Sequence, residues 1–418
     1  MSKFIITGGK RLSGEIEVMG AKNAALKILA ASILSDKKMI VTNVPNIEEI
    51  NRLLELMEAI GTEVHREGST LTLQTKEIAT TELDPTLVSK IRASVLLVGP
   101  LLIRSGEVRM PHPGGCAIGQ RPIDLFIEGY KKLGAEIKED NDGYTFKCKK
   151  FKGMTYIFPK ISVTVTEALM MAATMAEGTT VLKNAACEPE IQVLAEYLNR
   201  VGAKIEGAGT NTIKIEGVKE LTADTYEVIP DRIEAGSFAI LGALIGDDIK
   251  IVNCRPDHLE SLWAMFDRMG IDYQLGKDWV QVFGGVKIKA VDVQTHEYPG
   301  FVTDLQQPFT VLLTQADGMS LVHETIFEGR LFYTDMLKMM GANIIMCDPH
   351  RVIVNGPTKL YGRRLTSPDL RAGFAMVLAG LVAEGTTEID NIYQIDRGYS
   401  QIEKRLQKLG AEIKRVVD

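Results

Sequence analysis

The stretch QIEKRLQKLGAEIKRV (residues 401–416) contains the pattern that decides the fold. Its first half places Ile402, Leu406 and Leu409 on one helix face, and Gly410 follows directly. A glycine just after the last apolar position is typical of a helix C-terminus. The residues after it alternate between polar and apolar, as in a strand with one buried face. The stretch therefore predicts a helix, a glycine turn and a strand.

The same pattern recurs along the whole chain. Six times an apolar residue precedes a glycine that opens a strand-like segment, and successive glycines are 68 to 73 residues apart. The six are Gly61 (IGTEV), Gly134 (LGAEI), Gly202 (VGAKI), Gly270 (MGIDY), Gly341 (MGANI) and Gly410 (LGAEI). A fixed period of this kind indicates one supersecondary unit used six times.

A second helix is expected upstream of each glycine. Segments rich in Ala, Ser, Gly and Leu recur there, such as TEALMMAATMA (residues 166–176), and a strand often opened by Gly-Thr-Thr follows. Small residues on all sides of a helix favour close packing in a buried position. Each repeat of about 70 residues therefore predicts two helices and several strands, which is an α/β (α+β) fold.

The two ends of the chain are expected to complete one domain. The sixth repeat stops at Asp418, just after its first hairpin strand, and residues 4–18 at the N-terminus resemble the hairpin of another repeat, residues 212–228. We therefore expect a discontinuous domain of residues 1–21 plus 230–418 and a continuous domain of residues 22–229, with three repeats in each. A ligand cleft is expected at their boundary, where two crossings of the chain suit a hinge.

Composition excludes several classes of protein. The 418 residues carry a formal net charge of −6 and include no long Lys/Arg run, which argues against a nucleic-acid partner. The longest apolar stretch, residues 94–103, is about half a membrane span, and residues 1–7 alternate like a strand, so a cytoplasmic protein without membrane partners is expected. The five cysteines are widely spaced and form no Cys-x-x-Cys, so reduced thiols are expected rather than disulfides or a zinc site.

Cations collect at the predicted helix starts. Alignment by the repeat glycines places Lys22, Arg92, Arg232, Asp304 and Arg371 at the starts of the small-residue helices, and Arg121, Arg255, Arg330 and Arg397 before the other helices. Helix N-termini already favour anions, so a cation there indicates a bound anion. The alternative is that these arginines are solvated or pair with nearby acidic residues.

The segment PHPGGCAIGQRP (residues 111–122) is expected to be a lid loop, because it holds three glycines and three prolines. Cys116 lies in its middle, and Arg121 would favour its thiolate form. The alternative is a hairpin tip with an incidental cysteine. The other four cysteines are expected to be packing residues.

Acidic residues precede several of the predicted helices. Asp231 and Asp369 are expected to be N-caps, and the same interpretation is open for Asp304 in FVTDLQQPFT. The six histidines show no metal spacing, and the chain has no Walker or dinucleotide loop, so neither a metal nor a nucleotide cofactor is expected.

The chain resembles the UDP-N-acetylglucosamine 1-carboxyvinyltransferases, a family of enolpyruvyl transferases. The motifs that carry the resemblance are GAKNAAL (residues 20–26), IRAS (91–94), PGGCAIGQRPIDL (113–125), AEGTTVLKNAACEPEI (176–191), PDRIEAG (230–236), TDLQQPFT (303–310), ETIFEGRL (324–331), DLRAG (369–373) and IDRGYSQIEKRLQKLGA (395–411). The resemblance covers essentially the whole chain. It implies two inside-out α/β domains, each of three repeated units.

The resemblance also implies roles for individual residues. The phosphoenolpyruvate site would use Lys22, Asn23, Arg121 and Arg397 on the phosphate side and Arg371 at the carboxylate. The UDP-N-acetylglucosamine site would use Arg92, Arg121, Pro122, Ile123, Asp124, Leu125, Lys160, Ser162, Val163, Asp304 and Ile326. Cys116 would donate a proton and Asp304 would act as the base. Alkylation of Cys116 would make the enzyme sensitive to the epoxide antibiotic fosfomycin.

The reaction implied is enolpyruvyl transfer to the 3-hydroxyl of the UDP-sugar, the first committed step of peptidoglycan synthesis. Attack of a hydroxyl on an enol phosphate needs a base for the hydroxyl proton and an acid for the methylene carbon, and it passes through a tetrahedral intermediate that loses phosphate. A substrate with a phosphate and a carboxylate needs several fixed cations.

Several alternatives stay open at this point. The first is the related 5-enolpyruvylshikimate-3-phosphate synthase reaction, against which the lid cysteine Cys116 argues. The second is a cysteine hydrolase that uses Cys116 and His112, which would leave the clustered cations unexplained. The third is a catalytically silent sensor of UDP-sugars. One departure from the family pattern is the pair Thr164-Val165, where many members carry Gly-Ala, and it concerns the wall near the diphosphate. A monomer is favoured, although the sequence does not give the oligomeric state.

Overall fold

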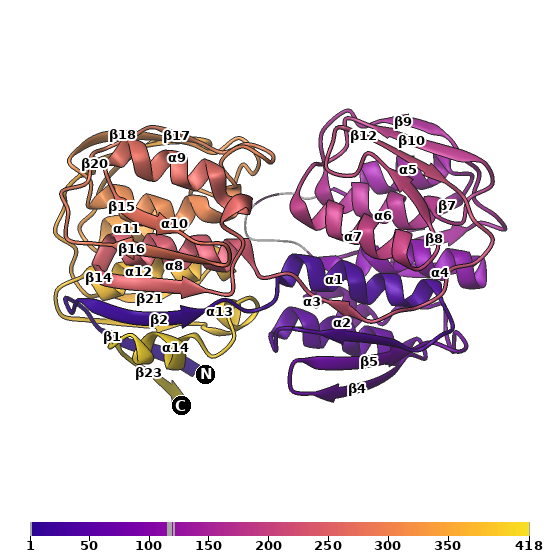
Figure 1. Ribbon diagram of the computed structural model, residues 1–418, viewed down its shortest axis with the longest axis horizontal. Coiled ribbons are helices and arrows are strands. Elements are labelled where there is room, and N and C mark those ends of the chain that lie inside the picture. The colour runs from indigo at the N-terminus through magenta and orange to yellow at the C-terminus, as the bar shows by residue number, and fades with distance from the viewer. Residues whose placement is uncertain (1, 115–118, 120–121, 418) are drawn as a thin grey trace. The chain divides into compact units, whose positions relative to one another are not determined.

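The computed structural model describes residues 2–114, 119 and 122–417. These residues form two compact units, which are treated separately below. The terminal unit contains residues 2–19, 119 and 230–417, and the inserted unit contains residues 20–114 and 122–229. Each unit mixes buried helices with open sheets, as the α/β prediction requires (Figure 1).

The inserted unit holds the first three repeats, and its sheets have the strand orders β13-β3-β5-β4, β11-β12-β10-β9 and β6-β8-β7. Its elements are α1 (Lys22–Ala31), η1 (Ser32–Leu34), β3 (Met39–Thr42), α2 (Glu48–Ala59), β4 (Glu63–Glu67), β5 (Thr70–Gln74), α3 (Pro85–Lys90), η2 (Arg92–Leu97), α4 (Val98–Ser105), β6 (Glu107–Pro111), α5 (Asp124–Lys132), β7 (Glu136–Asp140), β8 (Gly143–Lys147), β9 (Thr155–Ile157), α6 (Val163–Ala173), β10 (Thr179–Lys183), α7 (Pro189–Arg200), β11 (Lys204–Glu206), β12 (Thr212–Glu216) and β13 (Tyr226–Glu227).

The terminal unit holds the last three repeats, and its sheets have the strand orders β21-β22-β1-β23, β15-β16-β14-β2 and β17-β18-β20-β19. Its elements are β1 (Ser2–Thr7), β2 (Leu12–Glu17), α8 (Arg232–Ile245), β14 (Gly246–Val252), η3 (Pro256–Leu259), α9 (Glu260–Met269), β15 (Asp272–Leu275), β16 (Trp279–Phe283), β17 (Val293–Gln294), α10 (Thr303–Thr314), β18 (Gly318–His323), α11 (Thr334–Met339), β19 (Asn343–Asp348), β20 (Arg351–Gly356), β21 (Arg364–Thr366), α12 (Leu370–Val382), β22 (Thr386–Asp390), α13 (Tyr393–Asp396), α14 (Ile402–Lys408) and β23 (Glu412–Val417).

The six repeat glycines are all helix-ending glycines, which confirms the prediction. Their φ angles are 105°, 100°, 112°, 75°, 107° and 100° in chain order, a region that residues with a Cβ rarely adopt. At the last of them, the amide of Gly410 donates to the carbonyl of Gln407 and the amide of Ala411 to that of Leu406. These two bonds satisfy carbonyls that the helix end would otherwise leave open.

The small-residue helices form the buried centre of each unit. In the terminal unit α8, α10 and α12 pack against one another, with strands around them (Figure 1). Every residue of α8 except Leu244 is buried. Helices this close need positions without a side chain: a Cβ on Gly236 of α8 would lie 2.6 Å from Cδ1 of Leu305 on α10. The composition of these segments thus predicted their place in the fold correctly.

The first strand pairs with the last, as the sequence predicts. Strand β1 is antiparallel to β23, with Phe4 opposite Arg415, and its other edge pairs with β22. The two chain ends therefore lie side by side in one sheet (Figure 1). Strand β2 instead joins the sheet of the fourth repeat, parallel to β14.

An asparagine with positive φ follows the central strand in four repeats. These are Asn43, Asn184, Asn253 and Asn391, with φ between 54° and 57°. Each side-chain amide donates to the carbonyl of a residue just past the neighbouring parallel strand, namely Val228, Phe158, Val18 and Ser367, at 2.8 to 2.9 Å. In each case the amide of that residue donates back to the carbonyl just before the asparagine. We call this pair of bonds the asparagine clamp.

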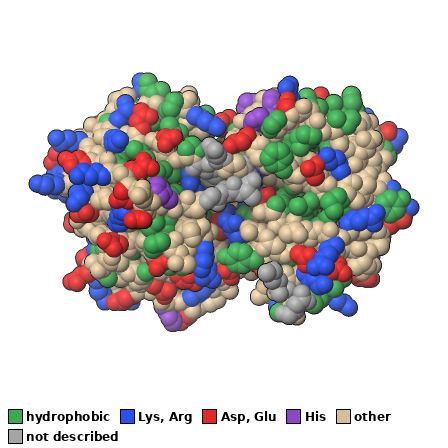
Figure 2. All heavy atoms as spheres, turned by 180° about the vertical axis from the view of Figure 1, so that it is seen from behind, with side chains coloured by type: hydrophobic (Ala, Val, Ile, Leu, Met, Phe, Trp, Pro, Cys, Tyr) green, Lys and Arg blue, Asp and Glu red, His purple; other side chains and the backbone are tan. Residues whose placement is uncertain are grey.

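The described residues show three further properties of the chain: its surface charge, its helix lengths and the state of its cysteines. Positive and negative side chains are interspersed over the face seen in Figure 2. No helix among the described residues is long and apolar enough to cross a membrane. The four described cysteines are free thiols, and Cys148 and Cys254 are buried. The packing role expected for Cys347 is wrong, because its side chain lies on the exposed face of β19.

Candidate active site

Asp304 lies in the first turn of α10 and binds two arginines. Its Oδ1 accepts from Nη2 of Arg330 at 2.7 Å, and its Oδ2 accepts from Nε of Arg371 at 3.0 Å. The N-cap position belongs to Val302, so the capping interpretation of Asp304 is wrong. A carboxylate between two guanidinium groups is held in its charged form and in one orientation.

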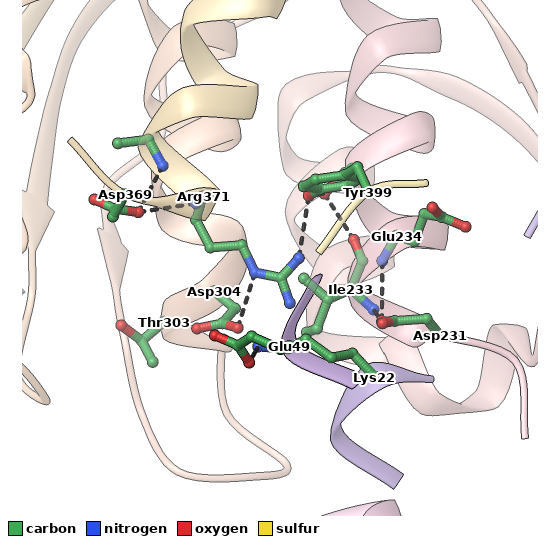
Figure 3. A network of polar contacts seen from close by, with 12 residues as sticks. Lys22, Glu49, Asp231, Ile233, Glu234, Thr303, Asp304, Asp369, Arg371 and Tyr399 are labelled. Atoms are coloured by element: carbon green, nitrogen blue, oxygen red, sulfur yellow. Dashed lines mark hydrogen bonds and ion pairs between the residues drawn. The ribbon is translucent and has the colours of Figure 1, made fainter. Parts of the chain in front are cut away.

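Arg371 projects from the first turn of α12 (Figure 3). Asp369 is the N-cap of that helix, as predicted, and its Oδ1 accepts from the amides of Arg371 and Ala372. The Arg371 side chain is 3% exposed, and Nη1 donates to the Tyr399 hydroxyl at 3.2 Å. Nη2 is buried and has no hydrogen-bond partner among the described residues. Because a buried unpaired donor is unfavourable, this nitrogen is suited to receive an anionic ligand.

The surroundings of Arg371 keep its guanidinium charged. Burial acts to lower the pKa of its guanidinium, but Tyr399, Asp304 and Asp231 outweigh burial and raise that pKa. Tyr399 is itself buried, and burial raises the pKa of its hydroxyl, so it is a neutral acceptor near pH 7. Arg371 is therefore a fixed cation at the start of a helix, where the free amides also favour an anion.

Arg330 is fully engaged by its neighbours. Its side chain is 2% exposed, and besides Asp304 it donates from Nη1 to Oγ1 of Thr303 at 2.8 Å. When the side-chain amide of Gln307 is oriented so that its nitrogen donates to the carbonyl of Thr303, its oxygen accepts from Nε of Arg330. The sequence placed Arg330 among the helix-start cations but gave it no role at the site. Its contact with Asp304 spans 26 residues of sequence and has no local signal.

Asp231 caps α8, which confirms the second N-cap prediction. Its Oδ1 accepts from the amides of Ile233 at 2.8 Å and Glu234 at 3.2 Å (Figure 3). Burial raises the pKa of Asp231 against the opposing charge of Arg371. The next residue, Arg232, is buried and lies 5.5 Å from the ring centroid of Tyr298.

The second set of predicted cations is not uniform. Arg397 is half-buried at the C-cap of α13, and its Nη1 donates to Oε1 of Gln394 at 2.8 Å. Arg255 is exposed at the N-cap of η3, as the solvated alternative predicts. The repeat therefore placed these arginines at related positions without giving them related environments.

The inserted unit carries its own set of cations at helix starts. Lys22 is the first residue of α1, and its Nζ donates to Oε2 of Glu49 at 2.8 Å, with the two side chains 11% and 13% exposed. Asn23 follows it and is half-buried, and Arg92 is the first residue of η2 and also half-buried. The structure thus places Lys22 and Arg92 at helix starts, as predicted.

The residues expected at the UDP-sugar differ in exposure. Pro122, Asp124 and Lys160 are exposed, while Leu125, Ser162, Val163 and Ile326 are half-buried. Ile123 is 5% exposed and packs in the core of the inserted unit, so only its backbone could meet a ligand. Ser162 is the N-cap of α6, and the Ile326 amide donates to Oε1 of Glu324 at 2.9 Å. Cys116 and Arg121 lie outside the described residues, so their roles stay predictions.

The pair Thr164-Val165, which departs from the family pattern, lies in the first turn of α6, and the same helix carries a buried carboxyl group at Glu167. Glu167 is fully buried, and neither of its carboxylate oxygens has a hydrogen-bond partner among the described residues. The nearest cation is Nζ of Lys27 on α1, 3.4 Å from Oε1. Burial raises the pKa of Glu167 to about 8, although Lys27 opposes the shift.

The double variant Lys27→Met/Glu167→Gln is expected to remove a pH dependence of stability. The folded protein keeps the Glu167 proton up to about pH 8, whereas the ordinary glutamate value is 4.5. The folded state thus binds more protons, so its contribution to stability is present below pH 4.5 and is lost as the pH rises toward 8. Relative to the variant, the wild type should lose roughly 1–3 kcal/mol of unfolding free energy between pH 5 and pH 8. Urea unfolding across this range measures the effect, and parallel curves would contradict it.

Comparison with known proteins assigns this chain and its fold to a class. The family described as EPSP synthase (3-phosphoshikimate 1-carboxyvinyltransferase) matches residues 6–406. The solved structure of the enolpyruvyl transferase NikO from Streptomyces tendae superposes with a TM-score of 0.91 at 25% identity, covering 100% of this chain and 99% of that one. EPSP synthase from Acinetobacter baumannii shares the fold with a TM-score of 0.77 at 18% identity. The class is thus that of the enolpyruvyl transferases.

Relatives of higher identity narrow the assignment. The UDP-N-acetylglucosamine 1-carboxyvinyltransferase of Koribacter versatilis is 47% identical, with 100% of this chain and 97% of that protein covered. The protein of the same name from Halothermothrix orenii is 46% identical, with full coverage of both. The chain belongs to the UDP-N-acetylglucosamine 1-carboxyvinyltransferase family and is a transferase.

Proposed function

We propose that the protein transfers the enolpyruvyl group of phosphoenolpyruvate to the 3-hydroxyl of UDP-N-acetylglucosamine and releases phosphate. The observation that carries the proposal is the pair of Asp304 and Arg371, in which a charged carboxylate lies beside a buried guanidinium with one nitrogen unpaired among the described residues. Such a pair offers a proton acceptor and an anion-binding donor within one network. The names of the relatives that match over the full chain support the choice of acceptor.

The addition step requires two proton transfers. Asp304 takes the proton of the sugar hydroxyl while the hydroxyl oxygen of the sugar bonds to the central carbon of phosphoenolpyruvate. Cys116 protonates the methylene carbon. In the resulting tetrahedral intermediate, the Cys116 thiolate takes a proton back from the methyl group as phosphate leaves, which restores the double bond and the thiol. Asp304 passes its proton to the departing phosphate and is again a carboxylate. Arg330 and Arg371 hold Asp304 as the carboxylate that this step needs.

The substrate charges are matched by cationic and polar side chains. In this proposal Lys22, Asn23, Arg121 and Arg397 bind the phosphate of phosphoenolpyruvate, and Arg371 binds its carboxylate. The residues that contact the UDP-sugar in this proposal are Arg92, Arg121, Pro122, Ile123, Asp124, Leu125, Lys160, Ser162, Val163, Asp304 and Ile326. Fixed cations bind the ground state and stabilise the charge that develops on the departing phosphate.

The nearest rival functions differ in acceptor or in turnover. A 5-enolpyruvylshikimate-3-phosphate synthase would use shikimate 3-phosphate, and a sensor would bind the UDP-sugar without changing it. The product proposed here carries a new enol ether on the sugar ring and would feed the synthesis of peptidoglycan precursors.

Identification of the product tests the proposal. Purified protein is incubated with phosphoenolpyruvate and UDP-N-acetylglucosamine, and the UDP-sugar fraction is examined by mass spectrometry and NMR. The expected result is a UDP-sugar heavier by one enolpyruvyl group, attached at the 3-oxygen. Recovery of unchanged UDP-sugar that nevertheless binds the protein would favour the sensor.

A further inference from the structure

The fifth repeat departs from the asparagine clamp. Glu324 stands where four of the other repeats have the asparagine. In each clamp the amide of the residue past the neighbouring strand donates to the carbonyl just before the asparagine, and here the amide of Thr295 donates to the carbonyl of His323, just before Glu324. The clamp to the neighbouring strand is still made, but by Thr325, whose hydroxyl donates to the carbonyl of Thr295 at 2.6 Å. Glu324 is therefore not needed to hold the strands together at this point.

The Glu324 carboxylate turns instead toward the start of α10. It is fully buried, and its Oε2 accepts from the Thr303 hydroxyl at 2.8 Å. Its Oε1 accepts from the amides of Ile326 at 2.9 Å and Phe327 at 3.2 Å. A buried carboxylate is unfavourable unless several donors satisfy it, so these three bonds account for its presence.

These bonds fix the donor-to-acceptor direction of a series of hydrogen bonds that ends at Asp304. The hydroxyl of Thr303 has one proton, and that proton is given to Glu324. Its oxygen is then free only to accept, and it accepts from Nη1 of Arg330 at 2.8 Å. Nη2 of the same planar guanidinium donates to Asp304 at 2.7 Å. The rigid fork of arginine transmits its position from one contact to the other.

We propose that Glu324 is a positioning residue for the reaction, which holds Arg330 against Asp304 through the hydroxyl of Thr303. The inference rests on the proposed role of Asp304 as base. A glutamine could not replace Glu324, because its NH2 group would face either the Thr303 hydroxyl or the amides of Ile326 and Phe327. In the first case the Thr303 proton would turn toward Arg330, and two donors would oppose each other.

Three variants test the chain of contacts. Glu324→Gln places an NH2 donor against either the Thr303 hydroxyl or the amides of Ile326 and Phe327, so one side of the contact is lost in both orientations. Thr303→Val removes the hydroxyl, and Thr303→Ser keeps it. We expect Glu324→Gln and Thr303→Val each to lower kcat roughly 10- to 100-fold, with both KM values within about threefold, since the base is displaced rather than lost. Thr303→Ser should stay within about threefold of the wild type. The double variant Glu324→Gln/Thr303→Val should be no slower than either single variant, because both substitutions act on the same contact between Thr303 and Arg330.

The pH dependence of kcat separates positioning from a general loss of stability. Weakening of the Arg330 contact makes the Asp304 carboxylate easier to protonate, so the acidic limb of the profile should move to higher pH in Glu324→Gln and Thr303→Val. The ring Nδ1 of His350 lies 2.8 Å from the Glu324 carbonyl oxygen, so the charge change in Glu324→Gln could also act on His350. Thr303→Val leaves Glu324 and this contact in place, so a shift that both variants share does not come from His350. The matched control is Asn253→Ala, which removes a clamp in the fourth repeat and should lower the melting temperature without moving this limb.

The outcomes are distinct. If Glu324→Gln and Thr303→Val lower only the melting temperature, as Asn253→Ala does, or if their effects on kcat multiply in the double variant, the positioning role is wrong. If Glu324→Gln does not fold, Thr303→Val and Thr303→Ser decide alone by the same criteria. A wild-type protein without turnover would contradict the proposed function itself, whereas these comparisons begin only from an active wild type.

Discussion

Asp304→Asn is expected to lower kcat by about 10²- to 10⁴-fold, the range typical for loss of a general base. Asparagine has nearly the same shape but cannot take a proton from the sugar hydroxyl. Its NH2 group would also face the donors of Arg330 or Arg371, which lie 2.7 and 3.0 Å from the carboxylate. Steady-state phosphate release measures the loss, and equilibrium binding of the UDP-sugar should change far less.

The matched control for this substitution is Asp335→Asn. Asp335 is exposed in the first turn of α11 and pairs only with Lys338 among the described residues, so its loss should leave kcat within about twofold. Equal activity of Asp304→Asn and the wild type at saturating substrates would exclude Asp304 as the base.

Arg371→Lys is expected to raise the KM for phosphoenolpyruvate about 10- to 150-fold, because a hydrogen bond to a charged group contributes about 1.5–3 kcal/mol. Lysine keeps the charge but not the planar fork, so its single nitrogen cannot reproduce the separate directions in which Arg371 meets Asp304, Tyr399 and a ligand. The KM for UDP-N-acetylglucosamine should change much less. Separate titrations of the two substrates measure the difference.

Arg364→Lys provides the comparison for Arg371→Lys. Arg364 lies on β21, its side chain is 71% exposed, and it pairs with Asp390 at 2.8 Å, so lysine should be tolerated there. A KM for phosphoenolpyruvate that does not change in Arg371→Lys, or KM values that rise equally for both substrates, would contradict the proposed contact with the carboxylate.

The architecture could be predicted because short sequence patterns that recur in every repeat determine it. Gly410 and its five counterparts end helices for a reason present in the backbone of each repeat, and the small residues of α8 indicate burial on all sides. The pairing of β1 with β23 followed from the likeness of the first residues to a repeat hairpin. The N-caps Asp231 and Asp369 could be predicted for the same reason, because each aspartate accepts from an amide only two residues further along the chain.

The network around Asp304 could not be predicted in the same way. Asp304 stands where an aspartate usually caps a helix, and only the positions of Arg330 and Arg371, 26 and 67 residues away, show another use. The role inferred for Glu324 needed the hydroxyl direction of Thr303, which depends on three elements at once. A sequence signal that could have drawn attention to Glu324 is an acidic residue at the position where four of the six repeats carry the clamp asparagine.

The most direct test of the central proposal is phosphate release from phosphoenolpyruvate, with UDP-N-acetylglucosamine and shikimate 3-phosphate as parallel acceptors. We expect release with the UDP-sugar and none above background with shikimate 3-phosphate. Release with shikimate 3-phosphate alone, or with neither acceptor, would contradict the proposed function.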